Sequence, residues 1–383
     1  MEIIERSLVS NGTFLNDSNT VIAIQKKLRA YPGLVDYDRI HDLKTLLEQT
    51  AQQSNFLLQM GDCAERFSEN SREVIYAKQK QILSFKKLIE HTLSMPVVPI
   101  GRIAGQYAKP RSSSTEIING QSIYPYHGDI INSESPYKSR VPDPERMIKA
   151  YAAAKLVLSH LADCGEQIFT SHECYLLEYE NSLIRTVNNI QYNLSAHLLW
   201  LGMRNISSQS HINHLSSIDN PVALKIGPNL HAASIIAAIQ QINPTNKQGK
   251  IILVTRLGYD KVCTLLPKLI EIIKQQQLQV IWMSDPLHGN THLDKYGKKY
   301  RLVTHAIDET IETCDILRSY CIQLGGIHLE ASPRMDIQEC VFSTKELVEN
   351  RTYDSALDPR LSASQCTEYL EQVLPSIQAN LGP

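Results

Sequence analysis

Residues 222–283 read VALKIGPNLHAASIIAAIQQINPTNKQGKIILVTRLGYDKVCTLLPKLIEIIKQQQLQVIWM, and this stretch decides the fold. Three short apolar runs, Val222–Ile226, Ile251–Thr255 and Val280–Met283, alternate with two longer amphipathic segments, Ala232–Ile242 and Asp260–Gln277. Runs that are apolar on both faces are typical of parallel strands buried between a core and a layer of helices. The alternation therefore predicts repeated βα units.

The same rhythm continues in both directions from about residue 55 onward. The other predicted strands are Phe56–Met60, Val97–Ile103, Gln167–Thr170, His197–Leu201 and Gly326–Leu329. The other predicted helices are Ser71–Ser94, Asp143–Cys164, Tyr175–Gln191 and Ala306–Leu324. Eight strands with interleaved helices predict an α/β protein with a closed (β/α)₈ TIM barrel, and a doubly wound open sheet is the alternative.

Residues 1–50 are predicted to form a short N-terminal helical extension, and residues 51–383 a single catalytic barrel. One helix is expected from Asn19 to about Ala30 and a second from Asp36 to Gln49. The polar stretch Tyr107–Val141 is rich in Ser, Pro and Gly, so we expect a loop or small excursion over one end of the barrel.

Composition excludes several classes of protein. The 383 residues are 43% hydrophobic and 20% charged, with a formal net charge of -2, so no basic field attracts nucleic acid or anionic membranes. No apolar run reaches the roughly 18 residues that span a bilayer. The N-terminal MEIIERSLVSNGTF has no secretory signal, and the eight cysteines form no CxxC pair. We therefore expect a cytoplasmic protein with reduced thiols and no nucleic-acid or membrane partner.

Cations gather near the predicted carboxyl ends of the strands, where barrels of this kind carry their active sites. Forked arginine donors match phosphate, and lysine adds a compact charge. So many cations predict two phosphate sites, and solvated or paired surface charge is the alternative. The set consists of Arg102, Lys109, Arg111, Arg204, Lys225 and Arg256, with Lys299 and Arg301 further along the chain.

Three residues after predicted strand ends and one later acid could hold a metal ion: Cys63, His288 and Glu330, with Asp358. One thiolate, one imidazole and two carboxylates form a mixed donor set that suits Mn²⁺, Fe²⁺, Co²⁺ or Zn²⁺. These residues come from distant segments, so a buried cysteine and ordinary loop acids without a metal remain the alternative.

Several ordered motifs resemble one enzyme family. They are FLLQMGDCAE (56–65), GRIAGQYAKPR (101–111), TSHE (170–173), SAHLLW (195–200), DPLHGNT (285–291) and DPRL (358–361). They look like the type II (plant-like) 3-deoxy-D-arabino-heptulosonate 7-phosphate (DAHP) synthases, the first enzymes of the shikimate pathway and of aromatic amino-acid biosynthesis. The chain is most similar to compact members that feed secondary metabolism, such as the phenazine-pathway type.

The resemblance implies a transferase that condenses phosphoenolpyruvate with the phosphorylated aldose erythrose 4-phosphate and releases phosphate. It implies a divalent metal, Mn²⁺ first and Co²⁺, Zn²⁺ or Fe²⁺ otherwise, on Cys63, His288, Glu330 and Asp358. A homo-oligomer, dimer or tetramer, is also expected. Expected substrate residues are Arg102, Arg204, Lys225 and Arg256 for phosphoenolpyruvate, and Lys109, Arg111 and Ser112 for the aldose phosphate, with Met203, Lys299 and Glu173 lining the cleft. The expected catalytic groups are Lys225, Arg102, His288 and Glu173.

Three positions depart from the family pattern. Met60 precedes Gly61-Asp62-Cys63 where the family usually has Gly, and Met203 stands between Gly202 and Arg204 where it usually has Glu. Tyr126-His127-Gly128-Asp129 has no Arg before the glycine. We expect both methionines near one pocket, packed together. Three interpretations stay open: retained activity, a related substrate, or a non-catalytic partner of another enzyme such as a chorismate mutase.

Overall fold

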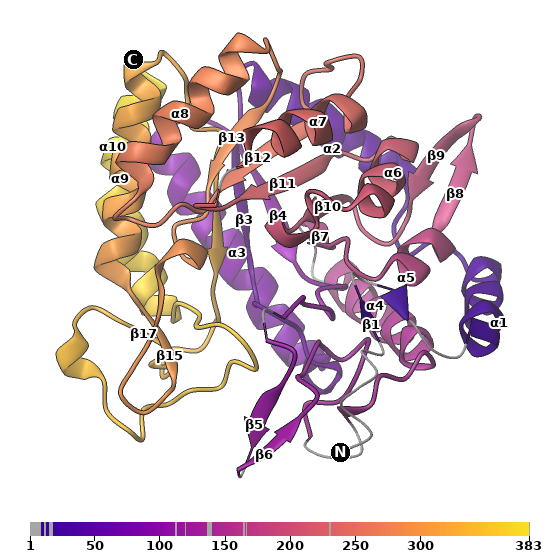
Figure 1. The fold of residues 1–383 in the computed structure, drawn as a ribbon. Helices are drawn as coiled ribbons and strands as arrows, with labels where there is room; N and C mark the ends of the chain where they lie inside the picture. Colours follow the sequence, from indigo (N-terminus) through magenta and orange to yellow (C-terminus); the bar gives the residue numbers. More distant parts are fainter. Residues whose placement is uncertain are drawn as a thin grey trace.

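Eight parallel strands close into one barrel, as predicted, in the order β10-β11-β12-β13-β16-β3-β4-β7 (Figure 1). The computed structural model describes residues 9–10, 13–14, 18–111, 113–118, 120–135, 140–163, 165, 167–229 and 231–382. The closed ring excludes the open-sheet alternative. The barrel strands are β3 (Phe56–Gly61), β4 (Val97–Arg102), β7 (Phe169–Glu173), β10 (Leu198–Leu201), β11 (Val222–Ile226), β12 (Ile251–Thr255), β13 (Ile281–Ser284) and β16 (Gly326–Glu330).

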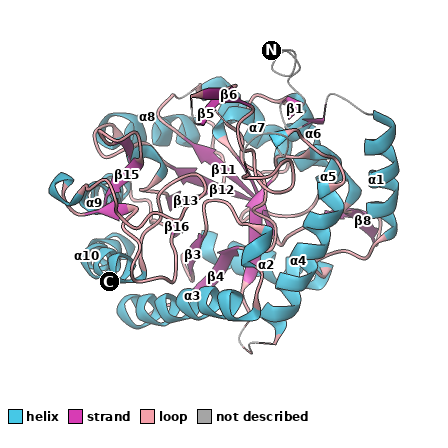
Figure 2. Ribbon diagram, turned by 90° about the horizontal axis from the view of Figure 1, so that it is seen from below, coloured by secondary structure: helices cyan, strands magenta, loops and turns pink. Residues whose placement is uncertain are grey.

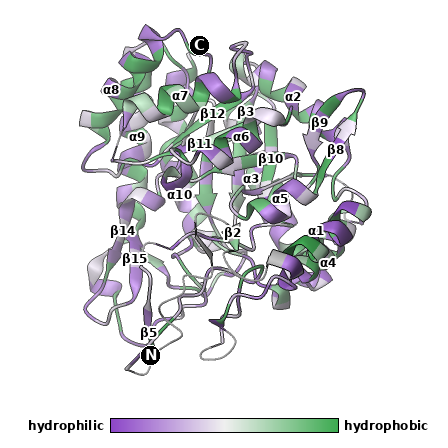
Figure 3. Ribbon diagram, turned by 45° about the vertical axis from the view of Figure 1, so that its right-hand side comes forward, coloured by the Kyte–Doolittle hydropathy of each residue, from purple (hydrophilic) through white to green (hydrophobic). Residues whose placement is uncertain are grey.

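Helices surround the barrel, and the view along it shows them as an outer ring (Figure 2). They are α3 (Arg72–Leu93), α4 (Arg146–Ala162), α6 (Gln209–Ser217), α7 (Ala232–Ile242), α8 (Val262–Gln275), α9 (Val303–Ser319) and α10 (Ala363–Leu381). The central strands are coloured hydrophobic, whereas the helices carry alternating hydrophobic and hydrophilic bands (Figure 3). Ser71 caps α3 and Ser362 caps α10, each by accepting a backbone N–H.

The N-terminal segment contributes to the barrel core. It contains the pair β1 (Val9–Ser10) and β2 (Thr13–Phe14), followed by α1 (Ser18–Ala30) and α2 (Tyr37–Ala51). Leu43 and Leu47 of α2 are fully buried in one cluster with inward-facing strand residues such as Leu57 and Ile252. Helix α2 therefore covers the N-terminal end of the barrel. A domain boundary after residue 50 stays a prediction.

The predicted helix Tyr175–Gln191 is wrong over most of its length. Only α5 (Leu177–Ser182) is helical, and β8 (Ile184–Val187) and β9 (Ile190–Asn193) then form an antiparallel hairpin. The two residues between these strands, Asn188 and Asn189, have φ of 52° and 62°. Such left-handed pairs favour a tight hairpin turn, and asparagine tolerates them.

Two predicted boundaries also move. Strand β7 runs from Phe169 to Glu173 rather than from Gln167 to Thr170, so the polar Ser171 and His172 lie within a barrel strand. Helix α4 begins at Arg146, because Asp143 first forms a turn in which its side chain accepts the Glu145 N–H at 2.9 Å. Side-chain hydrogen bonds stabilise the polar residues at the end of β7. The turn at Asp143 moves the start of α4 to Arg146.

Two excursions extend beyond the carboxyl ends of the strands, at the bottom of Figure 1. One, within the predicted loop 107–141, carries the hairpin β5 (Glu116–Ile118) and β6 (Gln121–Ile123). The other carries β14 (Thr291–Leu293), β15 (Lys299–Leu302) and β17 (Cys340–Val341). Short 3₁₀ turns are η1 (Phe67–Glu69), η3 (Met203–Asn205), η4 (His288–Asn290) and η5 (Thr344–Glu346). Within the described part of the chain, no helix has the length and apolar character needed to cross a membrane.

Candidate active site

Strand pairing brings predicted site residues to one level at the C-terminal end of the barrel. Glu330 of β16 pairs with Gly61 of β3, and Gly61 pairs with Arg102 of β4. A Cβ on Gly61 would lie 2.6 Å from the Arg102 carbonyl oxygen, so only glycine allows this close approach. Cys63 follows two residues later and joins the same rim.

The four predicted metal ligands lie in one group. Ligand atoms of Cys63, Glu330 and Asp358 all lie within 4.8 Å of one another. His288 Nε2 lies 2.8 Å from Glu330 Oε1. Cys63 and Glu330 are fully buried. Segments separated by hundreds of residues therefore converge on one point.

The Lys109 ammonium lies inside this group. Its Nζ contacts Cys63 Sγ, lies 2.5 Å from Asp358 Oδ2 and lies 3.7 Å from Glu330 Oε1. It offsets part of the negative charge there. An ion bound to the same atoms would repel the ammonium, so the lysine and the ion compete for one position.

The donor set fits a divalent cation. Burial, followed by the charge of Glu330, raises the pKa of the Cys63 thiol to about 12, and a bound cation would favour the thiolate instead. Among the described residues, Glu330 Oε1 has no hydrogen bond of good geometry, although cationic groups lie nearby. Its lone pairs are therefore available to an ion.

His288 is oriented by a second carboxylate. Its Nδ1 lies 2.7 Å from Asp285 Oδ2, on the side of the ring away from Glu330. Asp285 is fully buried. A carboxylate behind the imidazole fixes the ring and directs Nε2 toward the ligand group, which is the usual arrangement behind metal-binding histidines.

A second group of possible ligands, Asp285, His288 and His328, is less suited to an ion. His328 Nε2 already lies 2.7 Å from Arg102 Nη1 and 2.9 Å from Lys225 Nζ. Two cationic donors on the same nitrogen repel a metal ion, so the group around Cys63 is the better candidate.

A cavity of about 310 Å³ opens beside the metal-ligand group. Its wall combines cations with few acids, as expected for a site that binds phosphorylated molecules. The lining residues are Arg102, Gln106, Lys109, Pro110, Arg111, Ser113, Glu173, Trp200, Gly202, Met203, Arg204, Lys225, Arg256, His288, Lys299, Leu357 and Asp358. Predicted Ser112 lies outside the described residues.

Two of the cations are held at the bottom of the cavity. Arg102 and Lys225 are buried, and their charged groups lie 5.1 and 5.4 Å from the centroid of the Trp200 ring. Lys225 Nζ also lies 3.1 Å from Asp285 Oδ2. Burial lowers the pKa of Lys225 to about 8 although Asp285 opposes the shift. This lysine can therefore exchange a proton near neutral pH.

The other cations surround the opening. Arg204 Nη1 donates to the Pro110 carbonyl at 3.1 Å, and Arg256 Nη2 donates to the His288 carbonyl at 3.3 Å. Lys299 Nζ lies 2.6 Å from Asp358 Oδ1. Each guanidinium keeps donors that these contacts do not use, so they can bind an anion in the cavity.

Glu173 is a further buried carboxylate in the wall of the cavity. Its Oε1 is buried without a hydrogen-bond partner in the described structure. Burial raises its pKa, while the charge of Lys225 acts in the opposite direction. A Cβ on Gly202 would lie 2.3 Å from this oxygen, so the glycine provides its space. The oxygen is an open proton acceptor facing the cavity wall.

The expectation that Met60 and Met203 share a pocket is wrong. Met203 lines the cavity, and its Sδ would lie 2.6 Å from a Cβ on Gly227. Met60 instead belongs to the fully buried layer between β3 and the helices, with Leu58 and Ile75. Side chains alternate along a strand, so Gln59 faces the barrel interior and Met60 faces outward.

Trp200 and Arg360 shape the site, although the sequence gave them no predicted role. Trp200 supplies the apolar wall under the cations. Arg301, predicted among the phosphate-binding cations, does not line the cavity and instead donates from Nη1 to Glu330 Oε2 at 2.7 Å. Arg360 Nη1 donates to Asp62 Oδ1 at 2.6 Å, which ties the Cys63 loop to the Asp358 loop. Trp200 and Arg360 lie inside the quoted motifs, but only the packing shows what they contact.

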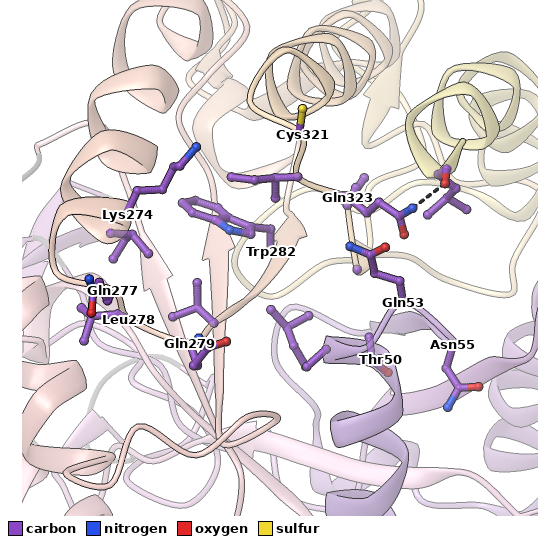
Figure 4. Close-up of a pocket in the computed structure, with 18 of the residues that line it drawn as sticks. Thr50, Gln53, Asn55, Lys274, Gln277, Leu278, Gln279, Trp282, Cys321 and Gln323 are labelled. Atoms are coloured by element: carbon purple, nitrogen blue, oxygen red, sulfur yellow. Dashed lines mark hydrogen bonds between the residues drawn. The ribbon is translucent and has the colours of Figure 1, made fainter. Parts of the chain in front are cut away.

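A second cavity, of about 380 Å³, lies at the opposite end of the barrel (Figure 4). It is lined by the ends of α2 and α8, by the segment that follows α9 and by the last residue of α10, with Trp282, amide side chains and Lys274 around it. No predicted site residue lines it. Cavity size therefore does not distinguish the two ends of the barrel.

Residues 6–167 and 164–373 match the model of the class-II DAHP synthetase family. The chain is 31% identical over 417 residues to phospho-2-dehydro-3-deoxyheptonate aldolase AroG of Mycolicibacterium smegmatis, with 92% of this chain and 89% of that protein covered. It is 32% identical over 354 residues to a probable phospho-2-dehydro-3-deoxyheptonate aldolase of Pseudomonas fluorescens, with 89% and 88% covered.

A solved structure supports the fold. The phospho-2-dehydro-3-deoxyheptonate aldolase of Francisella tularensis SCHU S4 superposes with a TM-score of 0.56 at 10% identity, covering 94% of this chain and 96% of that chain. At this identity the likeness concerns the fold only.

Proposed function

The chain belongs to the class-II DAHP synthetase family, and on this premise we propose that it condenses phosphoenolpyruvate with erythrose 4-phosphate and water to give DAHP and phosphate. One observation carries the assignment: a single cavity joins a mixed thiolate, imidazole and carboxylate group to a wall of cations. Two phosphorylated substrates held side by side gain most of their acceleration from fixed orientation.

Phosphoenolpyruvate occupies the inner part of the cavity. Arg102 and Lys225 neutralise its carboxylate and phosphate from below, and Arg204 and Arg256 do so from the rim. The Trp200 ring excludes water from beneath them, which strengthens each charge–charge contact. This arrangement orients C3 of the enol toward the aldehyde.

The aldose phosphate takes the outer part, with Arg111, Lys299 and Lys109 as its partners. Ser112 remains a predicted further contact. Lys109 becomes available when a divalent ion replaces its ammonium among the carboxylates. Binding of the ion and of the aldose phosphate would then reinforce each other through one side chain.

Cys63, His288, Glu330 and Asp358 would hold the ion, with Mn²⁺ as the first expectation and Co²⁺, Zn²⁺ or Fe²⁺ as others. The ion would act as a Lewis acid on the aldehyde oxygen and make its carbon electrophilic. Asp285 keeps the His288 ring in the ligand orientation.

Glu173 and Lys225 then handle the proton transfers that accompany the addition of water. C3 of phosphoenolpyruvate attacks the aldehyde carbon, positive charge develops at C2, and water adds there. Glu173 Oε1 accepts the proton of that water, and Lys225 Nζ exchanges a proton near neutral pH. The resulting hemiketal phosphate collapses with loss of inorganic phosphate.

The decisive experiment incubates the protein with Mn²⁺, phosphoenolpyruvate and erythrose 4-phosphate and follows phosphate release and DAHP formation. Turnover within the ordinary enzyme range is expected. Absence of release with each of the four divalent metals would reject the proposal and favour a non-catalytic partner role, which co-purification with a second enzyme would support.

Met203 favours a second candidate, a related acceptor aldehyde, because its thioether occupies cavity space and cannot act as a base. Met203→Glu should raise the rate with erythrose 4-phosphate if the natural acceptor differs. A lower rate in this variant, from an already active wild type, would reject the second candidate. Met60→Gly serves as the control outside the cavity.

Three further expectations accompany the activity: location in the cytoplasm, assembly as a dimer or tetramer, and a role in secondary metabolism. Light scattering on the purified protein tests the assembly.

A further inference from the structure

A chain of buried polar side chains crosses the barrel interior below the cavity. Gln59 on β3, Ser171 on β7 and His328 on β16 are each at most 1% exposed. Ser171 Oγ donates to the Gly101 carbonyl at 2.9 Å, and Gln59 Nε2 donates to Ser171 Oγ at 2.9 Å. Gln59 Oε1 lies 2.7 Å from His328 Nδ1. None of these three side chains lines the cavity.

The chain has a fixed direction. The Gly101 carbonyl can only accept, so the Ser171 hydroxyl donates to it and accepts from the Gln59 amide. The carbonyl oxygen of Gln59 then faces His328 and accepts from Nδ1–H. The proton of a neutral imidazole is thereby assigned to Nδ1, and a lone pair remains on Nε2.

Two cationic donors use that lone pair. Arg102 Nη1 lies 2.7 Å and Lys225 Nζ 2.9 Å from His328 Nε2. Guanidinium and ammonium groups are donors only, so a proton on Nε2 would face two further donors. The hydrogen bonds that start at the Gly101 carbonyl and the two cations at Nε2 therefore require the same tautomer of His328.

The lone pair on His328 Nε2 also offsets the repulsion between the charges of Arg102 and Lys225. Two positive charges held within hydrogen-bond reach of one atom repel each other in a buried environment. The His328 and Trp200 rings are perpendicular, with centroids 5.9 Å apart at 89°, and both cations lie over that same indole. Histidine, tryptophan and the two cations thus form one packed unit at the cavity floor.

We propose that His328 is a positioning residue: held in its Nδ1–H tautomer by Gln59 and Ser171, it sets the spacing of Arg102 and Lys225 that receives the carboxylate and phosphate of the enol substrate. It acts through these two side chains and does not touch the substrate. The assignment of the ligand rests on the proposed function, whereas the tautomer and the spacing rest on the hydrogen-bond chain alone.

Two pairs of variants test the role. His328→Gln keeps an acceptor near the position of Nε2, and His328→Met fills similar space without a strong acceptor. Gln59→Glu keeps an acceptor for Nδ1–H, and Gln59→Met removes it. We expect His328→Met to raise the KM for phosphoenolpyruvate and lower kcat/KM about 100-fold, with at least about tenfold recovery in His328→Gln. Gln59→Met should lose about tenfold and Gln59→Glu less.

His197 supplies the matched control. It is a buried histidine on the opposite side of β7, where its Nδ1 accepts the Thr170 N–H at 2.9 Å. His197→Met should lower the unfolding midpoint without changing the KM for phosphoenolpyruvate. Equal kcat and KM in His328→Met and His328→Gln, at equal unfolding midpoints, would overturn the positioning role.

A readout independent of turnover separates this inference from the proposed function. ¹⁵N-histidine NMR should show an Nδ1–H imidazole signal that disappears in His328→Gln. In Gln59→Met the Nδ1 resonance should shift, because the Nδ1–H loses its acceptor while the two cations still require a lone pair on Nε2. Calorimetry with phosphoenolpyruvate should show weaker binding in His328→Met than in His328→Gln. A wild type that binds phosphoenolpyruvate but forms no DAHP would reject the proposed function and leave this test intact. An Nε2–H signal from His328 would overturn the inference itself.

Discussion

The two ends of the barrel interior use the same strands for opposite purposes. Along β4, the inward-facing positions change from Val98 and Ile100 to Arg102, and along β11 they change from Ala223 to Lys225. The N-terminal end is sealed by apolar side chains of α2, whereas the C-terminal end buries charges around a cavity. On each strand, the apolar residue that packs in the core and the cation that lines the cavity are thus two positions apart.

This separation has an energetic reason. Burial of apolar surface stabilises the fold, whereas buried charge costs free energy unless it is paired. At the C-terminal end the pairing is extensive but incomplete, since acceptors of Glu173 and Glu330 remain without hydrogen bonds within the described structure. Bound ligands would provide partners for these acceptor oxygens.

Removal of the metal should give the largest effect and should act at one end only. Exhaustive chelation should lower the rate by about 10³-fold or more, because the loss of a Lewis acid costs several kcal/mol of transition-state stabilisation. Added Mn²⁺ should restore it, as followed by phosphate release. An unchanged rate in protein shown to be metal-free by elemental analysis would contradict the assignment of Cys63, His288, Glu330 and Asp358.

Two lysines, the buried Lys225 and the half-buried Lys250, sharpen the comparison, because desolvation lowers the pKa of each to about 8. Lys225→Met should lower kcat/KM about 10²- to 10³-fold. Lys250 Nζ instead donates to the carbonyls of Ile218 and Asn220 at 2.8 and 2.6 Å.

In Lys250→Met these carbonyls lose their donor, so we expect a loss of about 1–3 kcal/mol in stability and unchanged kinetics. Urea unfolding and steady-state rates on both variants measure the contrast. If Lys250→Met proved the more damaging to catalysis, the division between the two ends would fail.

Helix α2 should matter for stability alone. Leu47 is fully buried against the barrel core at the N-terminal ends of the strands. Leu47→Ala should therefore cost about 2–5 kcal/mol of stability, through lost burial and the remaining void. Below the unfolding transition, kcat and KM should match those of the wild type. A changed KM for either substrate would show that packing of helix α2 affects the geometry of the cavity.

The smallest effect is expected at the cavity at the N-terminal end of the barrel. Gln279 is exposed at its edge, and Gln279→Ala should leave kcat, KM and the unfolding midpoint within about twofold or 1 °C of the wild type, as for surface substitutions in general. A marked kinetic change would give this cavity a role that its lining does not suggest.

The sequence by itself determined the barrel, because eight apolar runs with interleaved amphipathic segments leave few ways to bury both faces of a parallel sheet. It also determined which residues follow the strand ends. It did not determine the hairpin at Asn188 and Asn189, where two left-handed residues outweigh helical spacing.

Only the tertiary structure decided which side chains share a site. The outward orientation of Met60 follows from strand alternation and register, and the contacts of Lys109 with Cys63 and Asp358 join residues far apart in the chain. The tautomer of His328 depends on partners from two other strands. Such properties arise from three-dimensional packing, because charge and hydrogen bonding depend on distance in space and not on separation along the chain.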